Sequence, residues 1–554
     1  MRELVGTALI CCLALPFVAA QAEPGFRPSV RGKKLIASGW HVPSIKVFRE
    51  RAPELEKLPY DGAIIGSFYP FWEGFRSQQA ALDEFVIDAK ATPFQRFTDN
   101  FIGVESGNDG GFDWFDEARC AHMVANWGRL AKAAKEAGFV GVKFDPECYE
   151  GPSPFEYTLQ KHRDTKTVHE YAARVEAVGR QVMQAINEHF PEMVILLYFG
   201  PSVAGDRSDL TKWCGLIPAF VDGMLREARP GFVIVDGYEQ AYGFRKPEQY
   251  AAAREKMKVL AMKASPVPKL FAKHVQAGFA VWPDNWHGDP GIQRTSFRCD
   301  DLDRNYYTPA ELAYAIHNAL AYSDKYVWQW AESFDPWNAR AMVFREAGKW
   351  EWQPVPEAFM HALAEGRKAV VPPPPARDLG QVGRKWTAAD LGPIDDETVF
   401  AGLWEQYQFV ADLPLRWRFQ TDVDGMGEER GWTSPAFDHR SWPLLCIRAL
   451  WDEQGYAGYL GYAWYRLWYE APDLPQGRRV YLAFGSVDES AWVYVNGRLC
   501  GVHDIDPDVG YQERFLMDVT PALRPGQPNL IAVRVRNTIG VGGIWRGVKL
   551  VLGR

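Results

Sequence analysis

The sequence predicts a protein of class α/β plus all-β, a (β/α)8 TIM barrel followed by a C-terminal β-sandwich. Over residues 34–366, short β-like runs alternate with long amphipathic segments, which is the pattern of repeated βα units around a parallel sheet. Consecutive prolines interrupt this pattern at residues 372–375. Beyond them, short alternating segments with turn pairs between them are typical of antiparallel β-structure.

Eight segments of the first part have the length and apolar content of β-strands. They are residues 34–40, 62–68, 97–104, 140–145, 193–199, 232–238, 270–281 and 326–330. Helical spacing of apolar residues occupies 117–137, 169–187, 246–264 and 309–321, and Gly138 stands where the residue after a helix C-cap is expected. Because no glycine-rich phosphate loop follows the first strand, the eight signals favour a closed barrel over an open nucleotide-binding sheet.

The chain of 554 residues is longer than one hydrophobic core usually organises, and composition divides it into four parts. Residues 1–22 predict a secretory signal peptide, with an apolar run from Leu4 to Ala20 that is short for a retained membrane helix. Residues 30–369 form the predicted barrel, 370–377 a stiff proline linker, and 378–554 the β-sandwich. We therefore expect a secreted or periplasmic protein with no membrane segment after cleavage.

Charge and cysteine content exclude several classes of partner. A formal net charge of −8 gives no indication of nucleic acid binding. The six cysteines of the mature chain are widely spaced without a paired metal pattern, so we expect neither a metal site nor a cofactor. The segment 301–305 opens like a calcium loop, but Tyr306 stands where the glycine should be, which indicates an ordinary loop. Oligomeric state and disulfide pairing stay open.

The C-terminal part contains a series of short motifs separated by turns. They are Asp438 to Trp442, Ala463-Trp464-Tyr465-Arg466, Phe484-Gly485-Ser486-Val487-Asp488, Val493-Tyr494-Val495-Asn496-Gly497, Gly501-Val502-His503, Asp518-Val519-Thr520 and Gly542-Gly543-Ile544-Trp545. Together they resemble the sugar-binding jelly roll of glycoside hydrolase family 2, over roughly residues 400 to 552 and in the order of that family. The resemblance implies a galactose-binding-like jelly roll, here placed after the barrel.

Acidic side chains gather where the predicted barrel strands end, and active sites of (β/α)8 enzymes lie at that face. The candidate catalytic residues are Asp145, Glu147, Asp236, Glu239, Asp284 and Glu332, which follow strands four, six, seven and eight. On strand four, Lys143, Asp145 and Glu147 alternate and predict one column that rises into the barrel mouth. Neighbouring carboxyl groups raise one another's pKa, which suits an acid/base pair for glycoside hydrolysis.

The end of strand four resembles the corresponding segment of two enzyme families. Gly141, Asp145 and Glu147 fall where family-18 glycoside hydrolases have their glycine, last aspartate and acid/base glutamate, although Val140 and Lys143 replace two further aspartates. The segment 143–145 equally resembles the strand-four end of α-galactosidase-like barrels. That resemblance implies Asp145 as nucleophile and an acid from strand six, Asp236 or Glu239.

Aromatic residues make up 14% of the chain and accompany these acids in several loops. The residues expected to bind substrate are Lys143, Tyr69, Trp72, Tyr198, Tyr238, Trp282, Trp286 and Trp330. Flat aromatic faces in consecutive strand-end loops fit a carbohydrate cleft better than a packed interior. The sequence therefore predicts a glycoside hydrolase with Glu147 as general acid/base and Asp145 as nucleophile or orienting partner. The alternatives are a non-catalytic glycan-binding protein and a transglycosylase that uses the same site.

Overall fold

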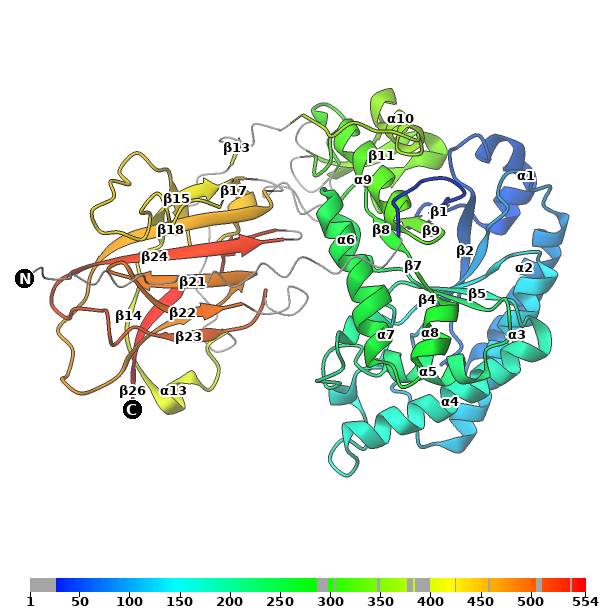
Figure 1. Ribbon diagram of the computed structural model, residues 1–554. Helices are drawn as coiled ribbons and strands as arrows, with labels where there is room; N and C mark the ends of the chain where they lie inside the picture. Colours follow the sequence, from blue (N-terminus) through cyan, green and yellow to red (C-terminus); the bar gives the residue numbers. More distant parts are fainter. Residues whose placement is uncertain are drawn as a thin grey trace, which may run out of the picture.

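The protein forms two lobes side by side, a barrel and a β-sandwich (Figure 1). The computed structural model describes residues 26–285, 297–302, 305–345, 349–375, 382–383, 399–423, 425–456, 459–504, 511–538 and 541–554. The predicted signal peptide lies outside these residues. Within them, no helix is both long and apolar enough to cross a membrane.

The barrel is a ring of parallel strands in the order β7-β6-β5-β4-β3-β2-β1-β9-β8. These strands are β1 (Lys34–Ala37), β2 (Gly62–Phe68), β3 (Phe101–Glu105), β4 (Gly141–Asp145), β5 (Val194–Leu197), β6 (Val233–Asp236), β7 (Val275–Ala277), β8 (Phe279–Val281) and β9 (Tyr326–Gln329). The first half of the seventh barrel position, β7, pairs with β6, and the second half, β8, pairs with β9. The ring therefore closes as the predicted eight-position barrel.

Gly278 is the joint between the two halves of this strand. Its N–H donates to the carbonyl of Asp236 at 2.7 Å. A Cβ at this position would lie 2.6 Å from Cγ1 of Val235, so a larger residue would not fit without movement. The strand predicted over 270–281 is correct only in its last part, because residues Pro268–His274 form helix α8. Proline at the first helical turn favours a helix, and a short apolar run does not distinguish a buried helix from a buried strand.

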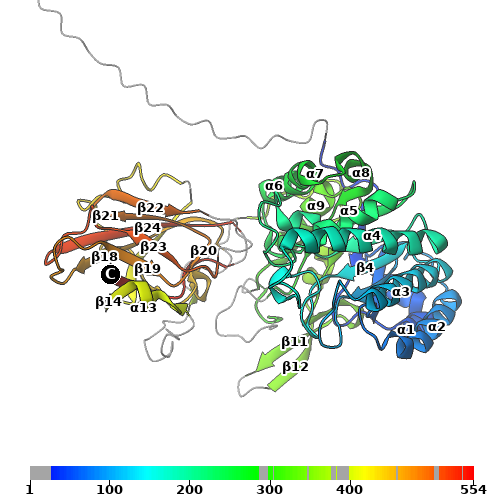
Figure 2. The same ribbon diagram turned by 90° about the horizontal axis from the view of Figure 1, so that it is seen from below.

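Helices cover the outside of the ring (Figures 1 and 2). They are α1 (Ile45–Leu55), α2 (Phe75–Ala91), α3 (Glu117–Glu136), α4 (Val168–His189), α5 (Ile217–Glu227), α6 (Pro247–Glu255), α7 (Ala261–Ala264), α8 and α9 (Pro309–Tyr322), with α10 (Glu357–Glu365) after the last strand. Thr167 with Glu170 begins α4 and Thr308 with Glu311 begins α9, each in a capping box. Gly138 has a φ of 72° just after α3, as the sequence predicts.

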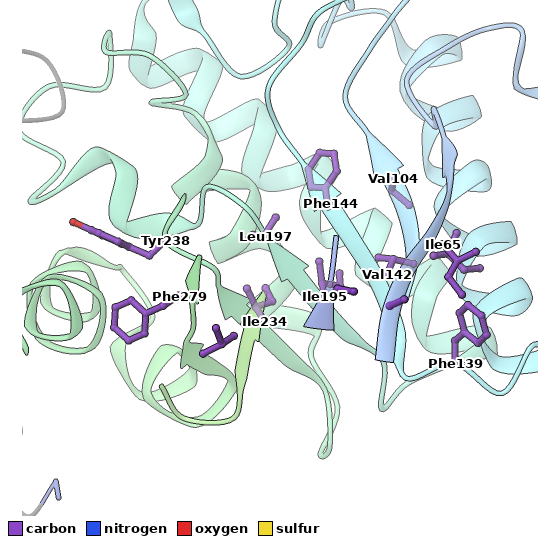
Figure 3. Close-up of a cluster of buried hydrophobic side chains, with 14 of the residues drawn as sticks. Ile65, Val104, Phe139, Val142, Phe144, Ile195, Leu197, Ile234, Tyr238 and Phe279 are labelled. Carbon is purple, nitrogen blue, oxygen red and sulfur yellow. The ribbon is translucent and has the colours of Figure 1, made fainter. Parts of the chain in front are cut away.

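The hydrophobic core lies mainly between the ring and its helices. Figure 3 shows outward-facing strand residues such as Val142, Phe144, Ile195 and Ile234 in one buried cluster. A smaller cluster fills the ring itself and includes Ile36, Phe101, Leu196, Val235 and Trp328. This alternation decides which strand-end side chains point into the barrel mouth, because residues two apart on a strand share a face.

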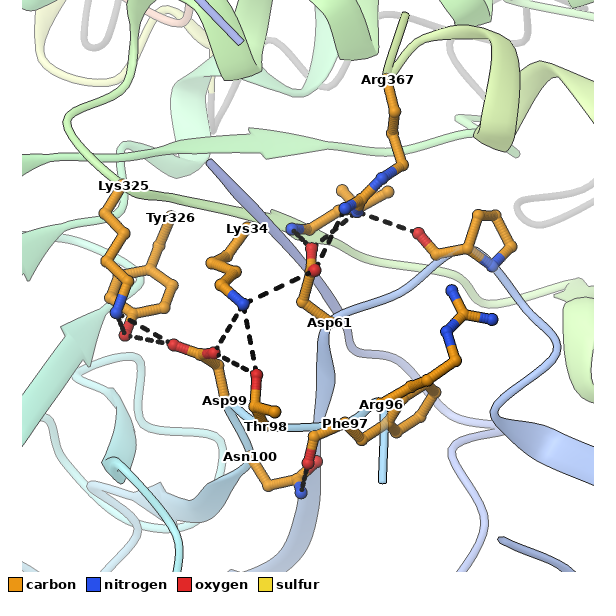
Figure 4. Close-up of polar contacts among 12 residues, drawn as sticks. Lys34, Asp61, Arg96, Phe97, Thr98, Asp99, Asn100, Lys325, Tyr326 and Arg367 are labelled. Atoms are coloured by element: carbon orange, nitrogen blue, oxygen red, sulfur yellow. Dashed lines mark hydrogen bonds and ion pairs between the residues drawn. The ribbon is translucent and has the colours of Figure 1, made fainter. Parts of the chain in front are cut away.

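A charged network closes the opposite end of the barrel, where the strands begin (Figure 4). The ammonium of Lys34 lies 3.1 Å from Asp99, and Lys325 lies 3.0 Å from the same carboxylate. Arg367 pairs with Asp61 at 2.6 Å. These pairs connect the starts of four barrel strands with the segment that follows α10.

A hairpin extends from the barrel after its last strand. It contains β10 (Phe334–Asp335), β11 (Arg340–Arg345) and β12 (Lys349–Pro354), paired antiparallel. Figure 2 shows β11 and β12 projecting beyond the helices. Residues 370–375 of the predicted linker then continue without helix or strand, and its residues 376–377 lie outside the described part.

The C-terminal lobe is a sandwich of two antiparallel sheets. One sheet contains β14 (Tyr407–Asp412), β26 (Val548–Gly553), β19 (Val480–Phe484) and β23 (Phe515–Asp518). The other contains β16 (Leu444–Cys446), β15 (Arg416–Asp422), β18 (Gly461–Glu470), β24 (Pro528–Asn537), β21 (Ser490–Val495) and β22 (Arg498–His503). The pairs β13 (Val382–Gly383) with β17 (Gln454–Gly455) and β20 (Val487–Asp488) with β25 (Gly543–Ile544) complete it, beside the short helix α13 (Leu403–Gln406).

Candidate active site

The mouth of the barrel contains the predicted column from β4. Lys143 is 3% exposed and Asp145 is 7% exposed, and both lie on the face of β4 opposite to the outward-facing Val142 and Phe144. The Lys143 ammonium lies 3.7 Å from Asp145 Oδ2. The backbone N–H of Glu147 donates to Asp145 Oδ1 at 2.9 Å, so the turn after the strand orients this carboxyl group. The half-buried Glu147 carboxylate accepts a hydrogen bond from the Tyr149 hydroxyl.

Glu105 is a member of the site that the sequence analysis did not name. It is the last residue of β3, in register with Asp145, and both its oxygens accept hydrogen bonds from Lys143, at 2.8 and 2.9 Å. The sequence contained the signal, because Phe101, Gly103 and Glu105 alternate as an inward-facing column. The predicted strand ended at residue 104, one residue short.

Glu239 comes to the same cluster from the loop after β6. Tyr238 adopts a left-handed conformation with φ 40°, and the tight turn Glu239–Gly243 follows. The neighbouring Tyr242 side chain favours the anion of Glu239 and so opposes the rise in the pKa of this carboxyl group. Glu239 Oε2 is buried and has no hydrogen-bond partner among the residues that the structure describes. A protonated carboxyl group aimed at a substrate oxygen would use such an atom.

The electrostatics of this cluster favour shared protons. Burial raises the pKa of Asp145 to about 8, with Lys143 opposing and the carboxylates of Glu105 and Glu147 adding to the rise. Burial and then the charges of Glu147 and Asp145 raise the pKa of Glu239 well above its usual value. Burial alone would lower the pKa of Lys143, but its contacts with Glu105 and Asp145 outweigh burial and raise that pKa. Neighbouring carboxyl groups with separated pKa values are the pattern of an acid/base pair.

Aromatic rings form the floor beside these acids. The ring of Tyr198 stacks on Trp328 with centroids 3.6 Å apart, and the Lys143 ammonium lies 4.2 Å from the Tyr198 centroid. Trp330 meets Tyr198 edge-on at 6.3 Å. Tyr242 links the floor to Trp282, with centroids 5.1 Å apart. The predicted substrate-binding residues Tyr198, Trp282 and Trp330 therefore belong to one contact network, together with Trp328 and Tyr242.

Tyr69 and Trp72 lie on the loop after β2. Their rings contact each other with centroids 5.2 Å apart, and both side chains are partly exposed. The Tyr69 ring borders Gly107, in the loop after β3. The pair therefore lies on the β2–β3 side of the mouth, next to the strand that carries Glu105.

Asp236 and Tyr238 lie away from the acid cluster. Val235 belongs to the interior cluster and Ile234 to the outer core, so the alternation turns Asp236 outward with Ile234. Its carboxylate accepts the N–H of Ser202 at 3.0 Å. Tyr238 packs against Phe279 in the outer core, as Figure 3 shows. The structure therefore brings Glu239, and not Asp236, to Asp145.

Asp284 and Glu332 meet each other beside the last strand. Asp284 Oδ2 accepts three backbone N–H groups, those of Glu332 at 3.0 Å, of Ser333 and of Phe334 at 2.9 Å. Burial raises the pKa of Asp284 to about 6, against these hydrogen bonds. The Glu332 carboxylate accepts the indole N–H of Trp330 at 3.2 Å. Asp284 thus fastens the loop that positions Glu332 and Trp330.

Other sequence predictions meet the limits of the described residues. Trp286 lies outside them, as do residues 303–304 of the segment that opens like a calcium loop. Among the residues that are described, no group of three or more histidine, cysteine or acidic side chains is arranged to hold a metal ion. The cysteines in this part of the chain form no disulfide with one another.

Comparison with known proteins finds short similarities to β-glucuronidases. No family model matches the chain. A curated β-glucuronidase from Formosa agariphila is 39% identical over 80 residues, which are 14% of this chain and 8% of that protein. A solved β-glucuronidase structure from Ruminococcus gnavus aligns with 27% of this chain and 29% of its own, at 19% identity and a TM-score of 0.23. The structure of the same enzyme with D-glucuronic acid gives 19% identity over 27% of this chain and 30% of its own, with a TM-score of 0.23.

Proposed function

We propose that the protein is a glycoside hydrolase with its active site at the carboxyl ends of the barrel strands. The observation that carries the proposal is the convergence of Asp145, Glu147 and Glu239 around Lys143, above a floor of stacked aromatic rings. Hydrolysis of a glycosidic bond needs one carboxyl group that donates a proton and one carboxylate that attacks the sugar or activates water. Carboxyl groups whose pKa values rise together provide both forms near neutral pH.

Asp145 is the carboxylate in this proposal. The Lys143 ammonium at 3.7 Å and the backbone N–H of Glu147 at 2.9 Å both stabilise its anion. As the pH rises, Asp145 therefore loses its proton before Glu239. The ionised carboxylate then faces the anomeric carbon as nucleophile, or holds the water that attacks it.

Glu239 is the proton donor. Burial and the charges of Glu147 and Asp145 raise its pKa well above its usual value, and its Oε2 atom is buried without a hydrogen-bond partner among the described residues. The proton moves from Glu239 to the glycosidic oxygen as the bond to the anomeric carbon breaks. Glu147, which the sequence analysis favoured as acid/base, is the second candidate donor, because its charge acts on both Asp145 and Glu239.

Lys143 and Glu105 position the attacking group. Lys143 donates hydrogen bonds to both oxygens of Glu105 and forms an ion pair with Asp145, so its ammonium stays protonated and fixed. Such a fixed cation keeps Asp145 ionised at a lower pH than the neighbouring carboxylates alone would allow.

The substrate is a carbohydrate, and glucuronides are the first to be tested because the similar proteins are β-glucuronidases. The same proposal includes export through the signal peptide and a sugar-binding role for the sandwich. The sequence features described above support both.

The decisive experiment measures hydrolysis of aryl glycosides, aryl β-D-glucuronide included, by the mature protein and its Asp145→Asn, Glu147→Gln and Glu239→Gln variants. Aryl groups that leave without protonation bypass the acid, so the variant of the true donor retains activity on them and loses it on poor leaving groups. Asp145→Asn loses activity on both kinds of substrate. Cleavage that survives all three substitutions would place the chemistry elsewhere, and binding without cleavage would favour the glycan-binding alternative. Product analysis with added acceptor sugars distinguishes transglycosylation.

A further inference from the structure

Several tryptophans of the barrel part have exposed side chains. Among the described residues, the tryptophans with exposed side chains are Trp40 at 59%, Trp350 at 39%, Trp352 at 39% and Trp468 at 46%. Trp468 belongs to the sandwich, whereas Trp40 follows β1 and the other two lie on β12. Apolar surface concentrated on a rigid element in this way marks a binding site more often than chance exposure does.

The hairpin presents Trp350 and Trp352 on one face. Residues two apart on a strand point to the same side, and the register places Trp350 opposite Phe344 and Trp352 opposite Met342 on β11. The guanidinium of Arg340 lies 4.1 Å from the centroid of Trp352. Asp335 in turn accepts a hydrogen bond from Arg340 Nε at 2.9 Å, so the base of the hairpin holds this ring in place.

This face is continuous with the barrel mouth. The ring of Trp352 meets His41 edge-on with centroids 5.2 Å apart, and His41 Nε2 lies 2.5 Å from the carbonyl oxygen of Glu332. The Glu332 side chain accepts the indole N–H of Trp330, and Trp330 contacts the floor ring Tyr198. A chain of contacts therefore leads from the floor beside Lys143 to the hairpin.

We propose that Trp40, Trp350 and Trp352 form a distal subsite for an oligosaccharide chain that extends from the sugar bound at Asp145. This inference rests on the proposed function and specifies its substrate class, a polysaccharide or long oligosaccharide. Sugar rings present flat C–H faces to tryptophan, and rings held on a strand lose little conformational freedom when a ligand binds. The projection of the hairpin beyond the helices suits a ligand longer than the mouth itself (Figure 2).

The test is affinity electrophoresis of the Asp145→Asn protein, in which hydrolysis does not disturb binding, in gels that contain glucuronoxylan, polygalacturonate, laminarin or xyloglucan. Additional Trp350→Ala or Trp352→Ala substitutions should weaken retardation by about tenfold in dissociation constant for the gel that binds. Trp352→Phe should retain most of the binding because it keeps an aromatic face. Ile87→Ala removes an exposed apolar side chain from α2, on the outside of the barrel, and is the matched control.

Loss of retardation in the hairpin variants, with Ile87→Ala unchanged, supports the subsite. Equal retardation of all variants, or retardation by none of these polysaccharides, overturns it. A concentration-dependent dimer that Trp352→Ala abolishes, without retardation, would assign the face to a second copy of the chain instead. Hydrolysis of small aryl glycosides does not use the hairpin, so the proposed function stands or fails by that separate measurement.

Discussion

The pKa of a buried carboxyl group is lowered at one end of the barrel and raised at the other. At the end where the strands begin, Asp99 and Asp61 are shared among Lys34, Lys325 and Arg367, each pair within 3.7 Å (Figure 4). Burial would raise the pKa of Asp99, but hydrogen bonds from neighbouring groups, Lys325 among them, outweigh it and lower that pKa. Asp99 is therefore stabilised as an anion.

At the mouth, the carboxyl groups of Glu105, Asp145 and Glu239 act on Lys143, and burial together with mutual repulsion raises the pKa of Asp145 and Glu239. At the strand starts, basic side chains balance the carboxylates and stabilise the ring. At the mouth, the carboxyl groups outnumber the ammonium of Lys143, and this arrangement lowers the stability of the fold. A protein retains a costly cluster where the chemistry needs it, so the comparison itself indicates which end of the barrel acts on a substrate.

Asp145→Asn should cause the largest loss of activity and should raise the stability of the fold relative to the natural protein as the pH increases. Without the carboxylate, kcat falls by roughly 10³-fold or more. Because its pKa is raised to about 8, Asp145 stabilises the fold below its ordinary pKa of 3.8 and loses this contribution as the pH rises through 8. The melting temperature of the variant relative to the natural protein should therefore increase between pH 5 and pH 8. A constant difference across this range would contradict the buried-acid interpretation.

Glu239→Gln should lower kcat by roughly 10²- to 10⁴-fold on substrates with poor leaving groups and much less on activated aryl glycosides. In the natural protein, Glu239 has to be protonated, so activity falls when the pH exceeds its raised pKa. This descending limb of the pH profile should disappear in the variant. Asp236→Asn is the matched control, since this acid ends β6, shortly before the turn that carries Glu239, and faces the outer core. Equal losses in the two variants would remove the distinction between the inward and outward acids.

Lys143→Met tests whether the Lys143 ammonium sets the pKa of Asp145. Removing the ammonium leaves Asp145 among carboxylates alone, so its pKa rises further. The ascending limb of kcat/KM should then move to higher pH, and each unit of displacement lowers activity at a fixed acidic pH by about tenfold. Lys143→Arg keeps the charge and should keep the limb near its original position. An unshifted limb in Lys143→Met would show that Asp145 does not set it.

The sequence predicts the barrel well because period-two alternation and helical spacing are local signals. It also places Lys143 and Asp145 on one face of β4, and that same alternation, applied to Val235, separates Asp236 from the mouth. Glu105 was missed because the end of a strand is the least certain part of its pattern. The helix Pro268–His274 was missed because an apolar run is ambiguous between strand and helix.

Contacts between distant segments left no local trace in the sequence. One example is the set of hydrogen bonds that Asp284 accepts from backbone N–H groups 48 to 50 residues away. These bonds show that an acid at a strand end can have a structural role. The approach of Tyr242 to Glu239 is another, because it depends on the left-handed turn at Tyr238. Such features follow from the closed ring and not from the spacing of residue types.

Asp99→Asn should have the smallest effect on activity and mirror the result for Asp145. The substitution removes the anion that Lys34 and Lys325 contact, at a cost of roughly 1–3 kcal/mol at neutral pH. Because the pKa of Asp99 is lowered, its contribution is present above its ordinary pKa of 3.8 and disappears as the pH falls through the lowered value. Denaturant unfolding should therefore show a stability difference that is full at pH 7 and shrinks below pH 4, while kcat of the folded variant stays within about twofold. A large loss of kcat would instead show that the network at the strand starts also positions the mouth, and the division between the two ends of the barrel would have to be abandoned.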